Sequence, residues 1–294
     1  MDPRGHLQAT GVDAAGRKQY LYHERWRAHR DRRKFDSMIA FGRALPRLRR
    51  RVGHDLRRRP RERGRQPVDE RLSRERVLAC TVRLLDVGFF RIGSDDYAER
   101  NESYGLTTML RGHVSIDDGT LVFDFPAKSG RRRVQAITDA DALEVVAELK
   151  RRRSGQQLLA YRESGRWVEL AAEEVNEYLK RLSGGDFTAK DFRTWNATVL
   201  AAVALAVDGE RATTSAARER RVKAAIKAVA AYLGNTPAVC RASYVDPRVI
   251  DRYQSGATIA DTLASLPAGD PDLSDAGVRR RVEAAVLELL GDGD

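Results

Sequence analysis

Apolar positions recur at helical spacing along most of the chain. Between residues 23 and 56 they lie three or four positions apart with arginines between them, which predicts an amphipathic helix. The same spacing predicts further helices over residues 68–86, 139–152, 173–182, 188–207 and 212–233, and one or two more over 258–290. The pattern therefore predicts a mainly helical protein.

Short runs of alternating polar and apolar positions predict the strands. Residues 5–22 are typical of a β-hairpin with its turn at 13–16, and they place Tyr20 and Tyr22 on one face. Three further strands are expected at 113–116, 121–125 and 133–137. The turn at 126–130 holds Lys128 at its tip. The expected fold class is α+β: a mainly helical domain with a small three-stranded antiparallel sheet, preceded by a hairpin.

Positive charge is concentrated near the amino terminus. The 294 residues carry a net charge of +11, and residues 1–80 hold 23 of the 53 Lys and Arg but only 10 of the 42 Asp and Glu. This asymmetry suits a polyanion held against one end of the molecule, of which nucleic acid is the commonest example. A solvated basic segment explains the same charge equally well.

Several other classes of protein are disfavoured by the composition. The longest apolar run, residues 197–207, is about half of the roughly 20 residues that a membrane helix needs. Cys80 and Cys240 are too few for a disulfide framework or a zinc cluster, which favours a reducing cytoplasm. The five histidines show no ligand spacing, so we expect no metal site.

Tyr244 is the candidate nucleophile. It follows an apolar helix that ends at Gly234 and a second start at Asn235-Thr-Pro, and it stands among small residues where a substrate could reach it. An unperturbed phenol has a pKa of roughly 10, so a catalytic tyrosine needs cations around its target. Taken alone, a tyrosine in such a position is most often a packing residue.

Three cations are candidates for that role. Arg91 emerges from an aromatic and aliphatic wall at residues 89–92, although pairing with a carboxylate at 95, 96 or 99 explains it as well. Arg193 lies in the first turns of a helix whose start has a Thr188-x-x-Asp191 capping pattern, where the helix end adds positive potential. Lys128, on its hairpin, is either solvated or a proton donor to an active site.

In this order and setting, Arg91, Lys128, Arg193, Asn235 and Tyr244 resemble the active site of the type IB DNA topoisomerases, in particular the poxvirus and bacterial branch of the tyrosine recombinase and topoisomerase superfamily. The motifs are Phe-Arg-Ile-Gly at 90–93, Lys-Ser-Gly at 128–130, Lys-Asp-Phe-Arg-Thr at 190–194 and Leu-Gly-Asn-Thr-Pro at 233–237. The resemblance extends from residue 5 to about residue 253.

The resemblance implies a mechanism. Tyr244 would attack a phosphodiester of duplex DNA to give a 3′-phosphotyrosyl bond, Arg91 and Arg193 would bind the non-bridging oxygens, and Lys128 would protonate the leaving 5′ oxygen. Neither ATP nor a metal would be required. The hairpin at 5–22 is similar to that branch's DNA-contacting hairpin, which makes Arg17, Lys18, Tyr20 and Tyr22 candidate DNA contacts.

Two features depart from the family. Asn235 stands where many members have histidine, and an amide donates a hydrogen bond but carries no charge. Family members also have several strands before the hairpin, so we expect residues 1–22 to be the remnant of a truncated amino-terminal β domain that binds DNA more weakly. Residues 23–294 would form the catalytic domain, with a basic helical part at 23–66, a core at 67–255 and terminal helices at 256–294.

Two other functions remain open. A tyrosine recombinase or integrase shares this chemistry, but those enzymes usually carry His-x-x-Arg, and Lys190 stands three residues before Arg193 here. A non-catalytic basic DNA-binding protein is the alternative from another class. For the topoisomerase we expect a bacterial, monomeric, cytoplasmic protein associated with the nucleoid, with no membrane partner.

Overall fold

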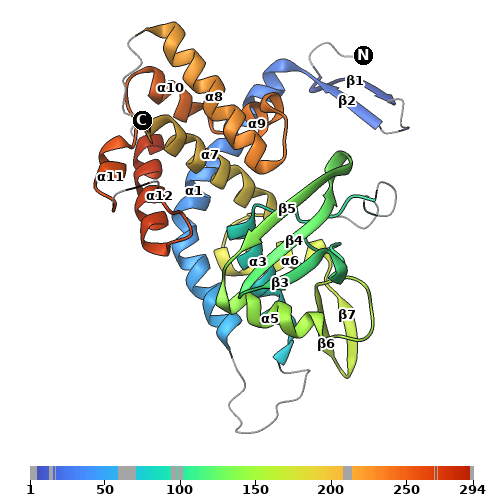
Figure 1. The fold of residues 1–294 in the computed structure, drawn as a ribbon. Helices are drawn as coiled ribbons and strands as arrows, with labels where there is room; N and C mark the ends of the chain where they lie inside the picture. Colours follow the sequence, from blue (N-terminus) through green and yellow to red (C-terminus); the bar gives the residue numbers. More distant parts are fainter. Residues whose placement is uncertain are drawn as a thin grey trace.

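The computed structural model describes residues 5–12, 16, 18–58, 71–93, 98, 102–207, 214–267, 269 and 271–291. It is an α+β protein in which a small antiparallel sheet lies at one side of a mainly helical body, so the predicted fold class is confirmed (Figure 1). In the described part of the chain, no helix is both long enough and apolar enough to cross a membrane.

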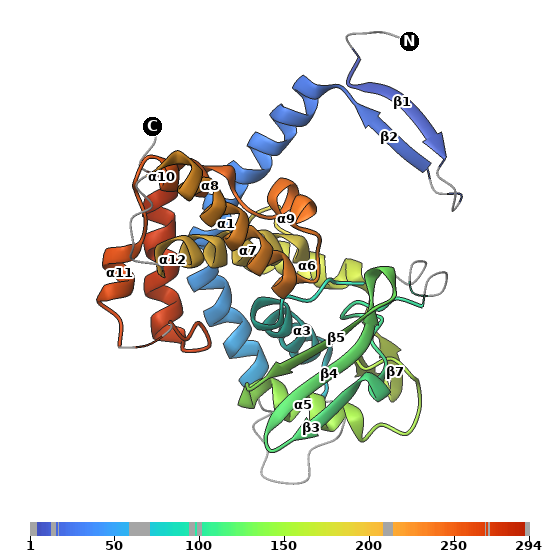
Figure 2. The ribbon, with the colours of Figure 1, turned by 45° about the horizontal axis from the view of Figure 1, so that its top comes forward.

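The amino-terminal hairpin pairs β1 (Leu7–Val12) with β2 (Lys18–Tyr22), as predicted. It stands away from the other elements at the start of α1 (Glu24–Arg57) in Figure 2. The Tyr22 ring stacks on Trp26 with 4.5 Å between centroids, and the two tyrosines predicted to share a face also stack, at 6.2 Å. Aromatic contacts therefore join the hairpin to the first turn of α1.

Helix α1 runs from the hairpin through the body of the molecule (Figure 2). Its apolar positions are buried as the periodicity predicted, with Met38, Phe41 and Leu45 fully inaccessible. Gly42 lets α1 approach the carboxyl-terminal half of the chain closely, because a Cβ there would lie 2.5 Å from the ring of Trp195. The basic helix is thus a core element as well as a charged surface.

Helix α3 (Arg74–Gly88) lies at the centre of the core, with eleven of its residues buried. It begins where the Ser73 side chain accepts a hydrogen bond from the Arg76 amide, and its predicted start at residue 68 lies outside the described residues. It ends at Gly88, as predicted, because Phe89 takes the left-handed conformation with φ 55°. This turn directs the chain towards Arg91.

The sheet has the order β3-β4-β5, from β3 (Val114–Asp117), β4 (Thr120–Ala127) and β5 (Arg131–Ile137). Asp118 and Gly119 both have positive φ, 42° and 75°, which suits the predicted two-residue turn. The buried face of β4 packs on Phe90 through Phe123, 4.8 Å between ring centroids. A short 3₁₀ turn, η2 (Lys128–Gly130), forms the tip between β4 and β5.

The sequence pattern missed one hairpin, β6 (Ala160–Glu163) with β7 (Arg166–Glu169). The other elements are η1 (Arg111–His113), α5 (Ala140–Lys150), α6 (Ala172–Ser183), α7 (Ala189–Val207), α8 (Ser215–Leu233), α9 (Pro237–Ser243), α10 (Pro247–Gln254), α11 (Ala260–Ala264) and α12 (Ala276–Gly291).

A buried cluster of charges, the Asp86 cluster, ties four helices together. It consists of Asp86 on α3, Arg49 on α1, and Arg279 and Glu283 on α12. Trp195 of α7 joins it by donating to Glu283 at 3.2 Å. Burial alone would raise the pKa of Asp86, but Arg279 and Arg49 lower it to about 2. The cluster therefore links α12 to the helix that carries Arg193.

Candidate active site

Arg91 and Asn235 meet although 144 positions separate them. Arg91 Nη2 donates to Asn235 Oδ1 at 2.5 Å. The backbone around Arg91 is fixed by Leu106, whose amide donates to the Arg91 carbonyl at 2.8 Å. The carboxylates at 95, 96 and 99 that offered another partner lie outside the described residues. The described partner of Arg91 is thus a neutral amide, and no carboxylate among the described residues pairs with it.

Asn235 is positioned by the change of direction between two helices. Gly234 closes α8 in the left-handed conformation with φ 65°, and the Thr236 side chain caps α9 by accepting from the Val239 amide. The Nδ2 of Asn235 is buried and has no hydrogen-bond partner among the described residues. An amide donor is therefore available at the junction that the sequence singled out.

Arg193 is buried, at 2% exposure, beside the candidate nucleophile. Its guanidinium carbon lies 5.2 Å from the centroid of the Tyr244 ring. The side chain donates to the Leu233 carbonyl at 3.0 Å and to the Phe89 carbonyl, while its Nε has no described partner. Burial, reinforced by Arg91, lowers the pKa of Arg193 to about 10.

The helix start that carries Arg193 forms as predicted. The Asp191 carboxylate accepts from the Thr188 amide at 2.7 Å and from the Thr188 hydroxyl at 3.0 Å. The rest of α7 is buried on nearly every side, which fixes the arginine in place.

Tyr244 follows α9 directly and is half-buried. Its amide donates to the Cys240 carbonyl at 2.9 Å, and its own carbonyl accepts from the Thr198 hydroxyl at 3.3 Å. On one side Lys34 of α1 donates to the Ser243 carbonyl. The backbone of the candidate nucleophile is thus held by α1, α7 and α9.

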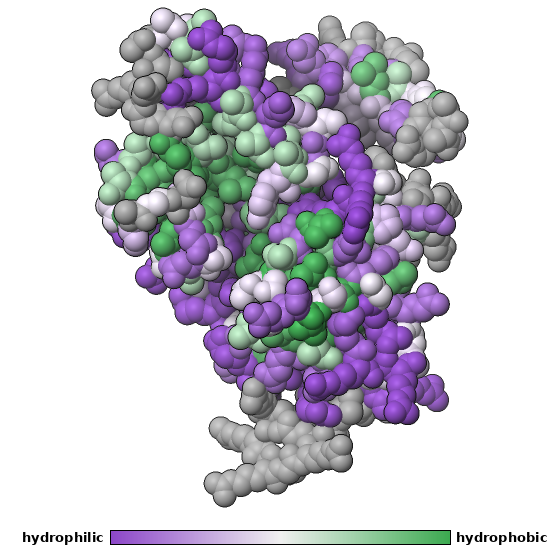
Figure 3. Space-filling model, viewed as in Figure 1, coloured by the Kyte–Doolittle hydropathy of each residue, from purple (hydrophilic) through white to green (hydrophobic). Residues whose placement is uncertain are grey.

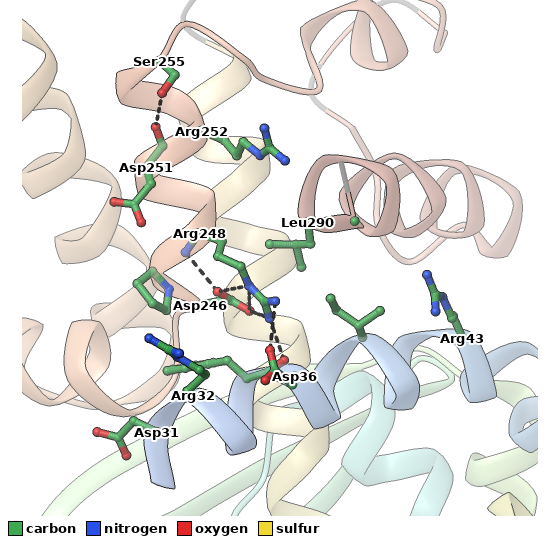
Figure 4. Close-up of a pocket in the computed structure, with 14 residues that line it drawn as sticks. Asp31, Arg32, Asp36, Arg43, Asp246, Arg248, Asp251, Arg252, Ser255 and Leu290 are labelled. Carbon is green, nitrogen blue, oxygen red and sulfur yellow. Dashed lines mark hydrogen bonds and ion pairs between the residues drawn. The ribbon is translucent and has the colours of Figure 1, made fainter. Parts of the chain in front are cut away.

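On the other side of Tyr244 an ion pair clamps α10 to α1. Arg248 pairs with the fully buried Asp246 at 2.8 Å and with Asp36 at 3.1 Å, and it donates to the Phe35 carbonyl at 2.8 Å. Figure 4 shows this clamp at the wall of a cavity of about 820 Å³ between α1, α10 and the end of α12. Contacts with α1 therefore flank Tyr244 on both sides.

Lys128 is exposed at the tip of the β4–β5 hairpin. It lines a cavity of about 480 Å³ together with Arg91, Arg133, Tyr232 and Gly234. Figure 3 shows hydrophilic side chains over this end of the hairpin. Lys128 and Arg91 thus line one cavity, and Arg91 contacts Asn235. Arg193 lies beside Tyr244 and is close enough to Arg91 for the two charges to interact.

Arg133 is a third guanidinium of the site that the sequence reasoning missed. Burial, then the charge of Arg91, lowers the pKa of Arg133. Within the described residues no carboxylate pairs with Arg91, Arg133 or Arg193. Three cations without a described counter-ion, together with unpartnered donors on Arg193 and Asn235, form a site for an anion. The alternation along β5, which turns Arg133 and Gln135 inward, was the signal that could have revealed it.

The candidate DNA contacts on the hairpin are placed in part. Lys18 and Tyr20 are exposed, Tyr22 is half-buried, and Arg17 lies outside the described residues. The Arg30 guanidinium lies 5.9 Å from the Tyr22 ring and 5.0 Å from the Trp26 ring, which extends the row of aromatic and cationic groups onto α1. Trp26 and Arg30 were not identified from the sequence.

No group of three or more His, Cys, Asp or Glu side chains arranged to hold a metal ion occurs in the described part of the chain.

Comparisons with known proteins show which proteins this chain is similar to. A model of the family described as the catalytic core of eukaryotic DNA topoisomerase I matches residues 23–263. The chain is also similar to the DNA topoisomerase 1B of Acanthamoeba polyphaga mimivirus, with 27% identity over 260 residues that cover 86% of this chain and 74% of the viral protein.

Proposed function

This chain belongs to the type IB DNA topoisomerase family, and from that premise we propose that it relaxes supercoiled duplex DNA through a transient covalent bond to Tyr244. The observation that carries the proposal is the position of the Arg193 guanidinium, 5.2 Å from the Tyr244 ring, within a group of cations that no described carboxylate neutralises. A phosphodiester is the anion that this combination of nucleophile and cations suits.

In the proposed cleavage step the phenolic oxygen of Tyr244 forms a bond to phosphorus and the bond from phosphorus to the 5′ oxygen breaks. The phenolic proton passes to solvent, and Lys128 gives a proton to the departing 5′ oxygen. The product is a 3′-phosphotyrosyl bond and a free 5′ hydroxyl. After the duplex has rotated, the 5′ hydroxyl attacks the phosphotyrosine and the reverse step restores both.

Arg91, Arg193 and Asn235 would stabilise the negative charge that grows on the non-bridging oxygens. Arg193 and Asn235 each keep a donor without a described partner, and Arg91 is held against Asn235. Donors fixed in advance need little reorganisation when the charge develops. The amide of Asn235 would serve here only as a hydrogen-bond donor.

The bond energy of the cleaved phosphodiester stays in the phosphotyrosyl bond, so the proposal includes neither ATP nor a metal. The partner is duplex DNA, with Arg17, Lys18, Tyr20 and Tyr22 of the hairpin as further contacts. We expect a monomer associated with the nucleoid. We also expect the boundary between its two domains to lie between residues 22 and 23. Bacterial origin stays a prediction, since the reported relative is viral.

The test is trapping of the covalent intermediate. Wild type and Tyr244→Phe are incubated with supercoiled plasmid, denatured and run on a gel that separates protein-linked DNA. We expect an adduct from wild type and none from Tyr244→Phe, with DNA binding nearly equal because one hydroxyl adds little to many phosphate contacts. Tyr253→Phe, from the neighbouring helix α10, is the matched control and should form the adduct.

An adduct from Tyr244→Phe would refute the assignment of the nucleophile. Relaxation of a plasmid that lacks any recombination site distinguishes the topoisomerase from a recombinase. A protein that binds DNA but forms no adduct would favour the non-catalytic alternative.

A further inference from the structure

Arg133 lies on the same hairpin as Lys128, five residues along the chain. It pairs with Phe125 in the register of β4 and β5, and its half-buried side chain points into the protein. In both ribbon views the carboxyl end of α8 lies beside β5 (Figures 1 and 2), and Arg133 spans the gap between them.

The guanidinium of Arg133 joins three segments of the chain. Nη1 donates to the Leu233 carbonyl at 3.1 Å, and Nη2 donates to the Gly88 carbonyl at 3.4 Å and to Gln135 Oε1 at 3.0 Å. Leu233 is the last residue of α8, and Gly88 is the last residue of α3. Carbonyls at helix carboxyl ends lack intrahelical partners and carry partial negative charge, so they suit a cation.

These two carbonyls stand just before residues of the proposed reaction. Gly88 precedes Arg91 by three residues and Leu233 precedes Asn235 by two. Arg193 donates hydrogen bonds to the same segments, at the Phe89 and Leu233 carbonyls. The Leu233 carbonyl therefore accepts from both Arg193 and Arg133. Arg133 thus links the hairpin of Lys128 to the segments that carry Arg91 and Asn235, at a point that Arg193 also fixes.

The position of Arg133 is electrostatically unfavourable, which is unexpected for a residue that only supports packing. Arg133 brings a half-buried positive charge close to Arg91 and Arg193, and no described carboxylate offsets it. An apolar side chain would fill the space without this repulsion. The hydrogen bonds of Arg133 fix the hairpin relative to the helix ends.

We infer that Arg133 is a positioning residue that holds the Lys128 hairpin against the segments of Arg91 and Asn235, so that the lysine reaches the leaving 5′ oxygen. This inference rests on the proposed function, in which Lys128 is the proton donor. Arg133 itself acts through Lys128 and touches neither the nucleophile nor the leaving group.

The experiment uses a leaving group that needs no proton. Cleavage sites are first mapped with the wild-type protein on a plasmid, and a duplex with one such site is made with either oxygen or sulfur at the bridging 5′ position. Rates of single-turnover adduct formation are measured for wild type, Lys128→Ala, Arg133→Met and Arg132→Met. A thiolate leaves without protonation, so a defect confined to the proton donor disappears on the sulfur substrate.

We expect Arg133→Met to slow cleavage of the oxygen substrate about 10- to 100-fold, since a misaligned donor loses part of the roughly 10²- to 10⁴-fold that general acid catalysis contributes. On the sulfur substrate we expect a rate within about threefold of wild type, as for Lys128→Ala. Arg132→Met removes the same charge from the preceding residue, whose side chain pairs with Asp124. It should leave the ratio of the rates on the oxygen and sulfur substrates as in wild type.

Equal loss on both substrates would overturn the inference and make Arg133 a direct ligand of the phosphate. No loss on either would also overturn it. If Lys128→Ala shows no rescue by sulfur, the proposed role of Lys128 fails and the inference fails with it. Rescue of Lys128→Ala without rescue of Arg133→Met refutes the inference alone. Should Arg133→Met unfold below the assay temperature, Arg133→Lys, which keeps the charge but loses the fork of donors, must show the same selective defect.

Discussion

Replacement of Asp86 by asparagine should destabilise the protein mainly by removing one charge. The carboxylate is 3% exposed and accepts from Arg49 at 2.8 and 2.9 Å and from Arg279 at 2.7 Å. Lowering its pKa from 3.8 to about 2 corresponds to roughly 2.5 kcal/mol of stabilisation at neutral pH, at about 1.4 kcal/mol for each pKa unit. Removing one partner from a buried ion pair costs a similar amount, about 3–5 kcal/mol.

The assay is thermal unfolding of Asp86→Asn and wild type across pH. A loss of about 3 kcal/mol should lower the midpoint by roughly 5 °C at pH 7, because the unfolding entropy of a 294-residue chain is about 0.6 kcal/mol/K. Because the folded-state pKa is depressed, the contribution of Asp86 is present above the unfolded-state pKa near 4 and is lost as pH falls through about 2. The two midpoints should therefore converge below pH 4.

The control is Asp124→Asn, which removes a carboxylate from an exposed pair with Arg132 and should barely move the midpoint. A difference between Asp86→Asn and wild type that is unchanged from pH 7 to pH 3 would show that shape rather than charge is responsible. A midpoint within 2 °C of wild type at pH 7 would contradict the account of the Asp86 cluster altogether.

Three further changes test the site. Asn235→Ala removes the acceptor of Arg91 and one donor to the phosphate. The rate of single-turnover adduct formation should therefore fall about 10²- to 10³-fold, with DNA affinity nearly unchanged. An unaltered rate would show that the amide does not stabilise the transition state. Arg248→Met breaks the clamp between α10 and α1 and leaves the buried Asp246 without its partner, so both the unfolding midpoint and the rate of adduct formation should fall. If neither quantity falls, the clamp does not hold Tyr244 in place. Lys18→Ala should reduce the slope of log affinity against log salt by about one if the hairpin contacts a phosphate, and an identical slope in filter-binding titrations would argue that it does not.

Local signals predicted the local structure well. The Asp-Asp-Gly turn and its alternating flanks predicted β3 and β4, and the Thr188 and Asp191 pair predicted the start of α7. A similar signal for β6 and β7 was present but missed, since Ser164 and Gly165 form a two-residue turn with positive φ at both positions. These features depend on neighbouring residues, which is why periodicity and turn chemistry reveal them.

Contacts between distant residues could not be predicted in this way. The resemblance to a family identified Arg91 and Arg193, but no pattern showed that Arg193 donates to carbonyls 104 and 40 positions away. Arg133 and the Asp86 cluster were missed because a buried charge and a solvated one look the same in sequence. Arg49 is one arginine among many on α1, and only folding places it against a glutamate 234 positions later.

Helix α1 is continuous from the hairpin of candidate DNA contacts to the residues on either side of Tyr244, through Lys34 and through the partners of Arg248. In the proposed reaction the cleaved duplex swivels while the hairpin still holds it. Any torque that the turning DNA exerts on the hairpin would then be transmitted along helix α1 to the backbone that carries the phosphotyrosine. In the proposed reaction, friction on the rotating strand would therefore affect the alignment that resealing needs.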